Sequence, residues 1–191
     1  METTKINTQN IYYPPGGILM WIIIFLELIT FGIALLFLVI NSKENPEIFH
    51  QSRGHLNATF GAVNTVFLLT SGFFMAATVR QFKNNNLHKT SFYLKLTMLG
   101  GVLFLLLKGI EYYLKMDAGY TIGYNTFFTF YWLLTGFHVI HVIVGLVILL
   151  WMQYAVKNSK ALLEDVEASA AFWHMCDLIW LLLFPVLYLI F

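Results

Sequence analysis

Residues 18–40 read ILMWIIIFLELITFGIALLFLVI, and Glu27 is the only ionisable side chain in this run. Crossing the hydrocarbon core of a bilayer takes about 20 mostly apolar residues. Four more apolar stretches of similar length follow, at 56–79, 91–114, 126–151 and 171–191. In lipid, backbone polar groups must be bonded within a helix or a closed barrel, and these runs far exceed the roughly 10-residue strands of a barrel. The sequence therefore predicts an all-α integral membrane protein, a bundle of five transmembrane helices.

The composition supports a membrane protein and excludes several other classes. Hydrophobic residues make up 59% of the 191 and charged residues only 11%, whereas a soluble domain is about a quarter charged. The net charge is +1 and there is no long basic run, so no nucleic-acid partner is expected. Cys176 is the only cysteine, which excludes an intrachain disulfide and a thiolate metal cluster.

The chain divides into a polar N-terminal segment, 1–17, and a five-helix membrane domain, 18–191. Residues 1–17 do not resemble a signal peptide, because the apolar run that follows them is too long for one. The sequence PPGG at 14–17 cannot extend a helix and should set the start of the first span. The connections between the spans are short, which leaves no room for a further domain.

The positions of lysine and arginine predict the orientation. Five spans place the N-terminus and the loops 80–90 and 152–170 on one side of the membrane. That side carries Lys5, Arg80, Lys83, Lys89, Lys157 and Lys160, and the other carries Lys43, Arg53 and Lys115. Cytoplasmic segments are enriched in these residues. The N-terminus is therefore expected inside and the C-terminus outside.

Seven ionisable residues stand out within the spans: Glu27, Lys108, Glu111, His138, His141, His174 and Asp177. Each costs about 2.5–3.5 kcal/mol at the bilayer centre, so such groups tend to face the bundle interior and to find partners. Six of the seven form pairs three residues apart, a spacing that places both members on one helix face. We therefore expect an internal polar network.

Each of these residues also has a plain structural interpretation. Lys108, near the outer end of its span, can pair with Glu111 and with lipid headgroups. His138 and His141 are expected to be neutral histidines that hydrogen-bond across helices. Glu27 needs a partner from another helix, or it stays protonated through desolvation.

His174 and Asp177 are expected to point inward near the inside surface. There they would form a hydrogen-bonded clamp, with plausible partners in His138, His141 and Glu111.

A metal site is a weaker interpretation of the same residues. The sequence lacks the Glu-x-x-His pairs of a di-iron bundle, and it has no P-loop, dinucleotide fingerprint or nucleophile triad. A single metal ion bound by histidine and aspartate stays open. It would make the chain a free-standing membrane metalloenzyme or a transporter that uses His138, His141, His174 and Asp177.

Two runs resemble a known family. TGFHVIHVIVGL (135–146) and AFWHMCDLIWLLLF (171–184) are similar to the last two helices of subunit III of haem-copper oxidases. Three further similar runs lie in order along the chain: FLELITFG (25–32), VNTVFLLTSGFFMAA (63–77) and TMLGGVLFLLLKGIEYY (97–113). The chain most resembles the five-helix bacterial form of this subunit.

The resemblance implies a non-catalytic subunit in the bacterial plasma (inner) membrane. The family's subunit III binds no haem or copper, packs directly against catalytic subunit I beside subunit II and other respiratory subunits, and holds phospholipid. It helps to sustain proton uptake during oxygen reduction. Glu27 matches the family's intramembrane glutamate, which reacts with carbodiimides, and the other polar residues except Lys108 fall on recurrent polar positions.

Two departures keep an alternative open. Many oxidase members have glutamine where this chain has Lys108, and the ending LLLFPVLYLIF (181–191) lacks their tryptophans. Both features are closer to the relatives that accompany nitric oxide reductases. The alternative is therefore an accessory membrane subunit of a nitric oxide reductase, and the electron donor of the complex stays undetermined.

Overall fold

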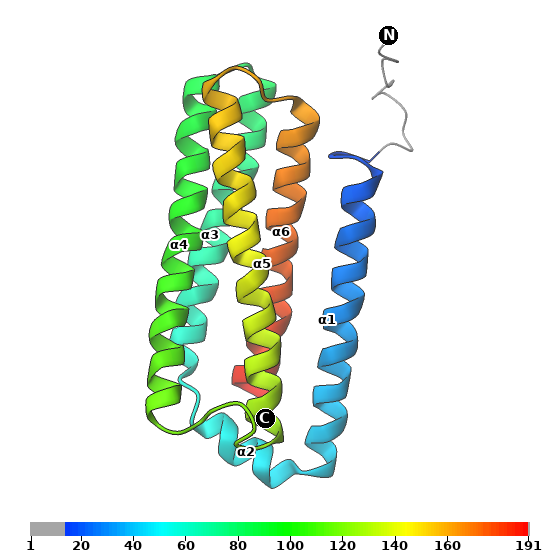
Figure 1. Ribbon diagram of the computed structural model, residues 1–191, viewed down its shortest axis with the longest axis vertical. Coiled ribbons are helices and arrows are strands. Elements are labelled where there is room, and N and C mark those ends of the chain that lie inside the picture. The colour runs from blue at the N-terminus through cyan, green and yellow to red at the C-terminus, as the bar shows by residue number, and fades with distance from the viewer. Residues whose placement is uncertain (1–13, 191) are drawn as a thin grey trace.

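The computed structural model describes residues 14–190, and their regular structure is entirely helical. The elements are α1 Ile18–Glu44, α2 Pro46–Gly54, α3 Ala58–Lys83, α4 Leu87–Asp117, α5 Thr126–Lys157, α6 Leu163–Pro185 and the π-helix η1 Val186–Ile190 (Figure 1). Within this part of the chain, five helices are long and apolar enough to cross a membrane. The predicted five-span, all-α fold is confirmed. Lys5 and most of the polar segment 1–17 lie outside the described residues.

Most of the long helices extend beyond the apolar stretches at one or both ends, because the polar residues there are also helical. Three of them begin at an asparagine whose side-chain oxygen accepts a backbone N–H in the first turn: Asn57 for α3, Asn86 for α4 and Asn125 for α5. Such N-caps satisfy donors that would otherwise lack partners. The α5–α6 connection is only 158–162, and α6 begins at Leu163 rather than near residue 171.

Helices α3, α4, α5 and α6 form a four-helix bundle. Helix α3 packs between α4 and α6, and α5 packs between the same two neighbours, so the bundle closes as a square. Helix α1 runs along the outside, against α6 and α5, and α2 crosses one end of the molecule (Figure 1). We call this end the α2 end, and the opposite end, with the turns 84–86 and 158–162, the turn end.

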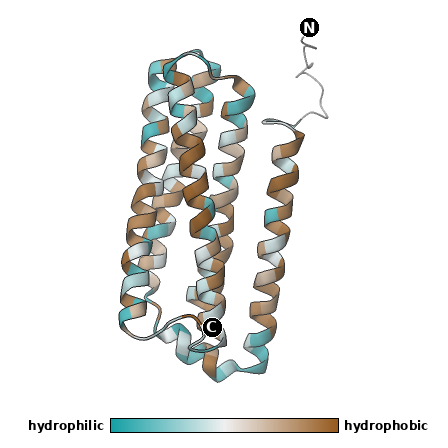
Figure 2. Ribbon diagram, in the orientation of Figure 1, coloured by the Kyte–Doolittle hydropathy of each residue, from teal (hydrophilic) through white to brown (hydrophobic). Residues whose placement is uncertain are grey.

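Hydropathy follows this arrangement. Apolar residues run along most of α1 and along much of α5, while polar residues gather at the two ends of the bundle (Figure 2). The residues spaced by seven along α3, Asn64, Ser71 and Thr78, are fully buried. The outer faces of the helices carry large exposed apolar side chains, as a lipid-facing surface requires.

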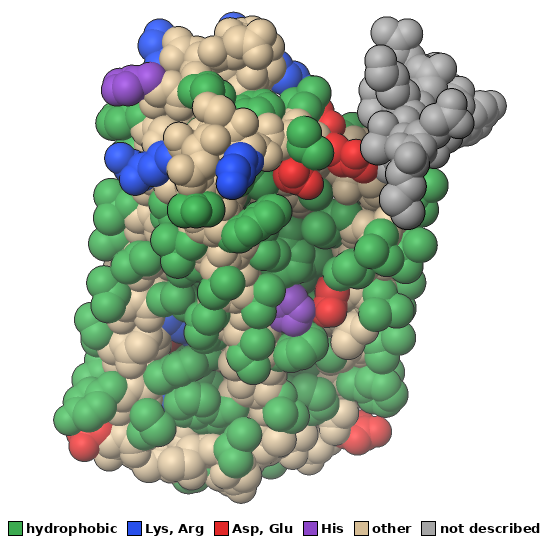
Figure 3. Space-filling view, turned by 45° about the horizontal axis from the view of Figure 1, so that its top comes forward, with side chains coloured by type: hydrophobic (Ala, Val, Ile, Leu, Met, Phe, Trp, Pro, Cys, Tyr) green, Lys and Arg blue, Asp and Glu red, His purple; other side chains and the backbone are tan. Residues whose placement is uncertain are grey.

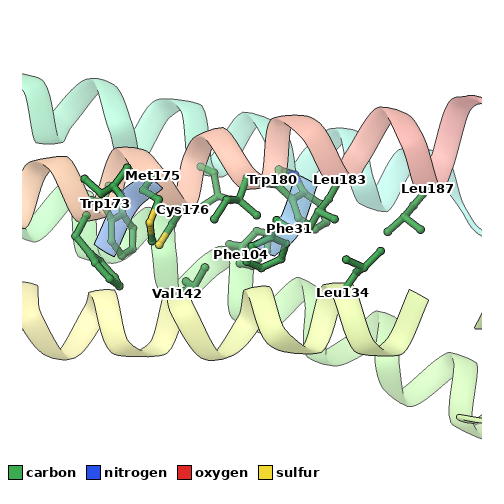
Figure 4. Packing of buried hydrophobic residues seen from close by; sticks show 14 of the residues in the cluster. Phe31, Phe104, Leu134, Val142, Trp173, Met175, Cys176, Trp180, Leu183 and Leu187 are labelled. Carbon is green, nitrogen blue, oxygen red and sulfur yellow. The ribbon is translucent and has the colours of Figure 1, made fainter. Parts of the chain in front are cut away.

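Two tryptophans of α6 fill the centre of the bundle. Trp173 and Trp180 are fully buried and lie among Phe31, Phe104, Cys176 and other apolar residues (Figure 4). The Trp173 ring sits directly on two glycines: a Cβ at Gly101 would come 2.5 Å from it, and one at Gly145 would come 2.9 Å from it. These glycines let α4 and α5 approach the indole closely.

Candidate functional site

The seven intramembrane residues do not form one network. The structure distributes them over four places: a lysine cluster around Lys108 and Glu111, a Glu27–His141 pair, an isolated His138, and a His174–Asp177 pair. The prediction that all of them meet in one internal network is therefore wrong. Each place is described in turn.

The lysine cluster joins α4, α5 and η1 at the α2 end. Lys108 Nζ donates to Glu111 Oε2 at 2.9 Å and to the Tyr188 hydroxyl at 2.7 Å. Tyr131 and Tyr188 in turn donate to Glu111 Oε1, at 3.0 and 2.6 Å. Both carboxylate oxygens and the ammonium group are thus hydrogen-bonded, which is the condition under which a buried ion pair is tolerated.

The cluster is sealed from the surroundings. The Lys108 side chain is 1% exposed and that of Glu111 is 2% exposed. The ammonium also lies 4.9–5.4 Å from the ring centres of Tyr112, Tyr131, Trp180 and Tyr188, where aromatic faces attract a cation. The expected pairing of Lys108 with Glu111 is confirmed, but the expected contact with headgroups is wrong because rings and Glu111 enclose the amine.

The C-terminal π-helix η1 contacts both the lysine cluster and α2. Helix α6 contains Pro185 in its last turn, and the chain continues as the π-helix η1. Arg53, at the end of α2, donates from Nε to the backbone carbonyl of Tyr188 at 3.0 Å. Tyr188 is thus held through its side chain by the lysine cluster and through its backbone by α2.

The Glu27–His141 pair links α1 to α5. Glu27 Oε2 lies 3.2 Å from His141 Nε2, and His141 Nδ1 lies 2.8 Å from the carbonyl oxygen of Phe137. A carbonyl oxygen can only accept, so Nδ1 carries a proton. One further proton can reside either on Nε2 or on the carboxyl group. Glu27 therefore has an ion-pair neighbour on another helix, as expected, although the contact lacks the geometry of a hydrogen bond.

His138 is the exception among the histidines. It is fully buried between Phe104, edge-on at 5.5 Å, and Trp180, stacked at 5.5 Å. Among residues 14–190, neither of its ring nitrogens has a hydrogen-bond partner. The prediction that it hydrogen-bonds across helices is wrong, because ring packing surrounds it on both sides.

The His174–Asp177 pair lies on the outer face of the bundle. His174 Nδ1 is 3.4 Å from Asp177 Oδ2. The His174 side chain is 45% exposed and the Asp177 side chain 9% exposed. They line a groove of about 390 Å³ between α3 and α6. The prediction that both point inward is wrong for His174, and His138, His141 and Glu111 are not their partners.

The pair lies well along α6. His174 lies eleven residues after Leu163, the first residue of α6, which is about 16 Å along the helix axis at roughly 1.5 Å per residue. The polar residues 163–170 are helical as well, so the expected place of the pair near the inside surface stays a prediction.

Several hydroxyl groups act as partners that charge-based reasoning did not single out. Ser71 donates to the carbonyl of Thr97 at 2.7 Å and accepts from Trp173 Nε1 at 3.0 Å. Thr65 accepts from Trp180 Nε1 at 3.0 Å. The seven-residue spacing of small polar residues on α3 was the available signal for Ser71. Nothing in the sequence identified Tyr131 and Tyr188 as partners of one carboxylate.

The geometry does not support a metalloenzyme site. Among the described residues 14–190, no three His, Cys, Asp or Glu side chains come close enough to bind one metal ion. His138, His141 and the His174–Asp177 pair each have different neighbours, so the hypothesis that they share one ion is wrong. What the arrangement does chemically is to tie helices together and to place exchangeable protons within the apolar interior.

Comparisons with known proteins find relatives along most of the chain. The sequence model of the family "Cytochrome c oxidase subunit III" matches residues 56–190. Cytochrome c oxidase subunit 3 of Rhipicephalus sanguineus is 33% identical over 129 residues, which cover 66% of this chain and 49% of the relative. The Synechocystis protein of the same name is 30% identical, over 67% of this chain and 55% of the relative. Cytochrome bo(3) ubiquinol oxidase subunit 3 of Buchnera aphidicola is 26% identical, over 89% of this chain and 91% of the relative. The chain spans about half the length of several curated relatives that it matches.

Proposed function

The chain belongs to the cytochrome c oxidase subunit III family, and from this premise we propose that it is a non-catalytic subunit III of a bacterial haem-copper terminal oxidase. Oxygen reduction and proton translocation take place in the partner subunits. This chain stabilises subunit I within the membrane and holds phospholipid against the complex. It works in the plasma membrane of a bacterium.

The observation that carries the proposal is the match over residues 56–190, which includes four of the five spans. The internal chemistry supports a structural role. The polar contacts of the lysine cluster run between side chains of this chain and bond its ammonium and carboxylate groups to one another and to two tyrosines. Such a cluster fixes α4, α5 and η1 relative to one another.

The proposed orientation places the turn end inside. Arg80, Lys83, Lys89, Lys157 and Lys160 lie at or near this end, and Figure 3 shows Lys and Arg side chains gathered there. Lys43, Arg53 and Lys115 lie at the α2 end. Since positive charge favours the cytoplasmic side, the N-terminus is inside and the C-terminus outside.

The lipid-holding role is proposed for the outer flank around α1. This helix packs mainly against α6, α5 and α2, and much of its surface is apolar and exposed. Figure 3 shows a histidine beside an acidic side chain, with hydrophobic side chains around them. Acyl chains that cover these hydrophobic side chains would keep water away from the Glu27–His141 pair.

The experiment compares the oxidase purified with and without this chain. If the chain stabilises subunit I and sustains proton uptake, both preparations start at the same rate of oxygen consumption. The preparation that lacks the chain then loses activity within fewer turnovers and retains less phospholipid. Equal lifetimes and equal lipid content in the two preparations would contradict the proposed role.

A further inference from the structure

Tryptophan and tyrosine rings form a continuous path from the centre of the bundle to its α2 end. We call this path the aromatic relay, and its members are Trp180, Tyr188, Tyr131, Tyr112, Trp132, Tyr120 and Tyr124. It begins at the buried Trp180 (Figure 4), whose ring centre lies 6.4 Å from that of Tyr188. The ring centre of Tyr131 is 6.5 Å from Tyr188 and 5.6 Å from Trp132. The inner half of the relay therefore connects α6 and η1 to α5.

The outer half of the relay leads into the loop between α4 and α5. The rings of Tyr112 and Trp132 pack together, with their centres 4.6 Å apart. Trp132 Nε1 donates to the backbone carbonyl of Tyr120 at 2.8 Å, and the ring of Tyr120 lies 5.2 Å from that of Tyr124. Tyr124 is 58% exposed, whereas Trp180 is fully buried. The path therefore runs from the interior of the protein to its surface.

The chemistry of these rings differs from that of ordinary apolar packing. Tryptophan and tyrosine are the aromatic side chains that lose a single electron most easily, and electrons pass readily between rings that lie this close. A phenol that loses an electron also gives up its proton, so it needs a proton acceptor within hydrogen-bond reach. Tyr131 and Tyr188 both donate to Glu111 Oε1, at 3.0 and 2.6 Å. The buried tyrosines therefore have that acceptor in place.

Electrostatics sets the direction in which a positive charge moves along the relay. The Lys108 ammonium lies 4.9–5.4 Å from the ring centres of four members, Tyr112, Tyr131, Trp180 and Tyr188. At such distances it repels a positive charge that rests on these rings, and the apolar interior adds the cost of burying that charge. At the exposed Tyr124, water screens the charge and takes up the phenolic proton. An oxidised state that arises inside is therefore more stable at the outer end.

We propose that the aromatic relay carries oxidising equivalents from the interior of the chain to Tyr124 at its surface. The oxidant is a hydroxyl radical, which incomplete reduction of oxygen yields. It takes one electron from a relay ring and becomes hydroxide. Electrons then move inward from ring to ring until Tyr124 is the oxidised residue, and its phenolic proton combines with the hydroxide to give water.

The Tyr124 radical is repaired at the surface. It takes a hydrogen atom from a soluble reductant of the ascorbate class, which restores the phenol. The buried rings are thereby spared irreversible oxidation. This activity goes beyond the proposed function, which supplies only the source of the oxidant, and it is tested on this chain without any partner subunit.

Photo-oxidation of the full chain in detergent micelles tests the relay. Light at the red edge of protein absorption ionises tryptophan, and hexamminecobalt(III) in the buffer takes up the ejected electron irreversibly. A small nitroso spin trap that enters both water and detergent marks tyrosyl radicals, and peptide mass spectrometry locates the adducts. The relay predicts an adduct on Tyr124 and at most a trace on Tyr113, which is 66% exposed but is not a relay member. Equal adducts on the two tyrosines would overturn the proposal.

Substitutions at Trp132 separate electron transfer from packing. Trp132→Tyr keeps an easily oxidised ring, whereas Trp132→Phe keeps an aromatic ring that resists oxidation. Both variants lack the indole Nε1–H that bonds to the carbonyl of Tyr120, so they share any structural effect of its loss. The adduct on Tyr124 is expected to persist in Trp132→Tyr and to be lost in Trp132→Phe. Loss in both variants, or persistence in both, would overturn the proposal.

The source of the charge is tested in the Trp132→Tyr background. An adduct on Tyr124 in this variant has to come from another tryptophan. Adding Trp180→Phe should abolish it, whereas adding Trp151→Phe should leave it unchanged, because Trp151 is 59% exposed and outside the relay. Circular dichroism checks that each variant keeps its helices. An adduct that survives Trp180→Phe would overturn the proposed path from the interior.

Discussion

The lysine cluster gives the sharpest prediction about stability. Lys108→Met removes the ammonium group but keeps an unbranched side chain of similar length. Glu111 then loses the 2.9 Å contact at Oε2, while Oε1 keeps its bonds from Tyr131 and Tyr188. Glu111→Gln is the reciprocal change and leaves the ammonium with the Tyr188 hydroxyl as an acceptor at 2.7 Å.

The expected magnitude follows from burial. Both side chains are at most 2% exposed, so water cannot replace the lost partner. Removing one member of such a pair costs about 3–5 kcal/mol, because the other charge stays buried without compensation. The double variant Lys108→Met/Glu111→Gln leaves no uncompensated charge. It should be no less stable than either single variant, which corresponds to a coupling energy of about 3 kcal/mol.

The assay is SDS-induced unfolding in mixed micelles, followed by circular dichroism. Lys83→Met serves as the control, because Lys83 pairs with Glu167 at 2.7 Å but is 51% exposed. That variant should lose no more than about 1 kcal/mol. If the double variant costs the sum of the two single variants, the buried pair is not coupled and the reasoning is refuted.

Three further predictions concern packing, reactivity and orientation. Gly101→Ala should cost about 1–3 kcal/mol, because its Cβ would come 2.5 Å from a tryptophan ring, whereas Gly109→Ala on the same helix meets nothing within 4 Å and should cost nothing in the same unfolding assay. A hydrophobic carbodiimide should label Glu27, detected by peptide mass spectrometry, and labelling that persists in Glu27→Gln would contradict this. A cysteine at Asn84, in the turn after α3, should react with an impermeant maleimide only in inside-out vesicles, and one at Ala118, after α4, only in right-side-out vesicles. The single native cysteine is buried and should add little background, and the opposite pattern would reverse the orientation.

The fold could be predicted from the sequence because one physical constraint dominates it. Backbone polar groups in lipid must be bonded locally, so an apolar run such as 18–40 has few conformations available. The ends of the helices were harder to place. Residues 163–170 are polar, yet they form the first two turns or so of α6, which begins at Leu163. Hydropathy alone does not indicate that such a polar stretch is helical.

The site residues could be identified, but their neighbours could not. The spacing of three residues placed Lys108 with Glu111 and His174 with Asp177 correctly. It could not show that the first pair is fully buried and that His174 faces outward. A helix has several faces, and only its rotation against the other helices decides which face is inside. His138 shows the same limit, because its partners are the rings of Phe104 and Trp180.

The most direct test of the central claim is affinity purification of the tagged chain from its own membranes in mild detergent. A reduced-minus-oxidised absorption spectrum and peptide mass spectrometry are recorded on the product. The account predicts haem signals together with peptides of a haem-copper oxidase catalytic subunit in equal proportion to this chain. A product that contains this chain without haem, or with the catalytic subunit of a nitric oxide reductase instead, would contradict it.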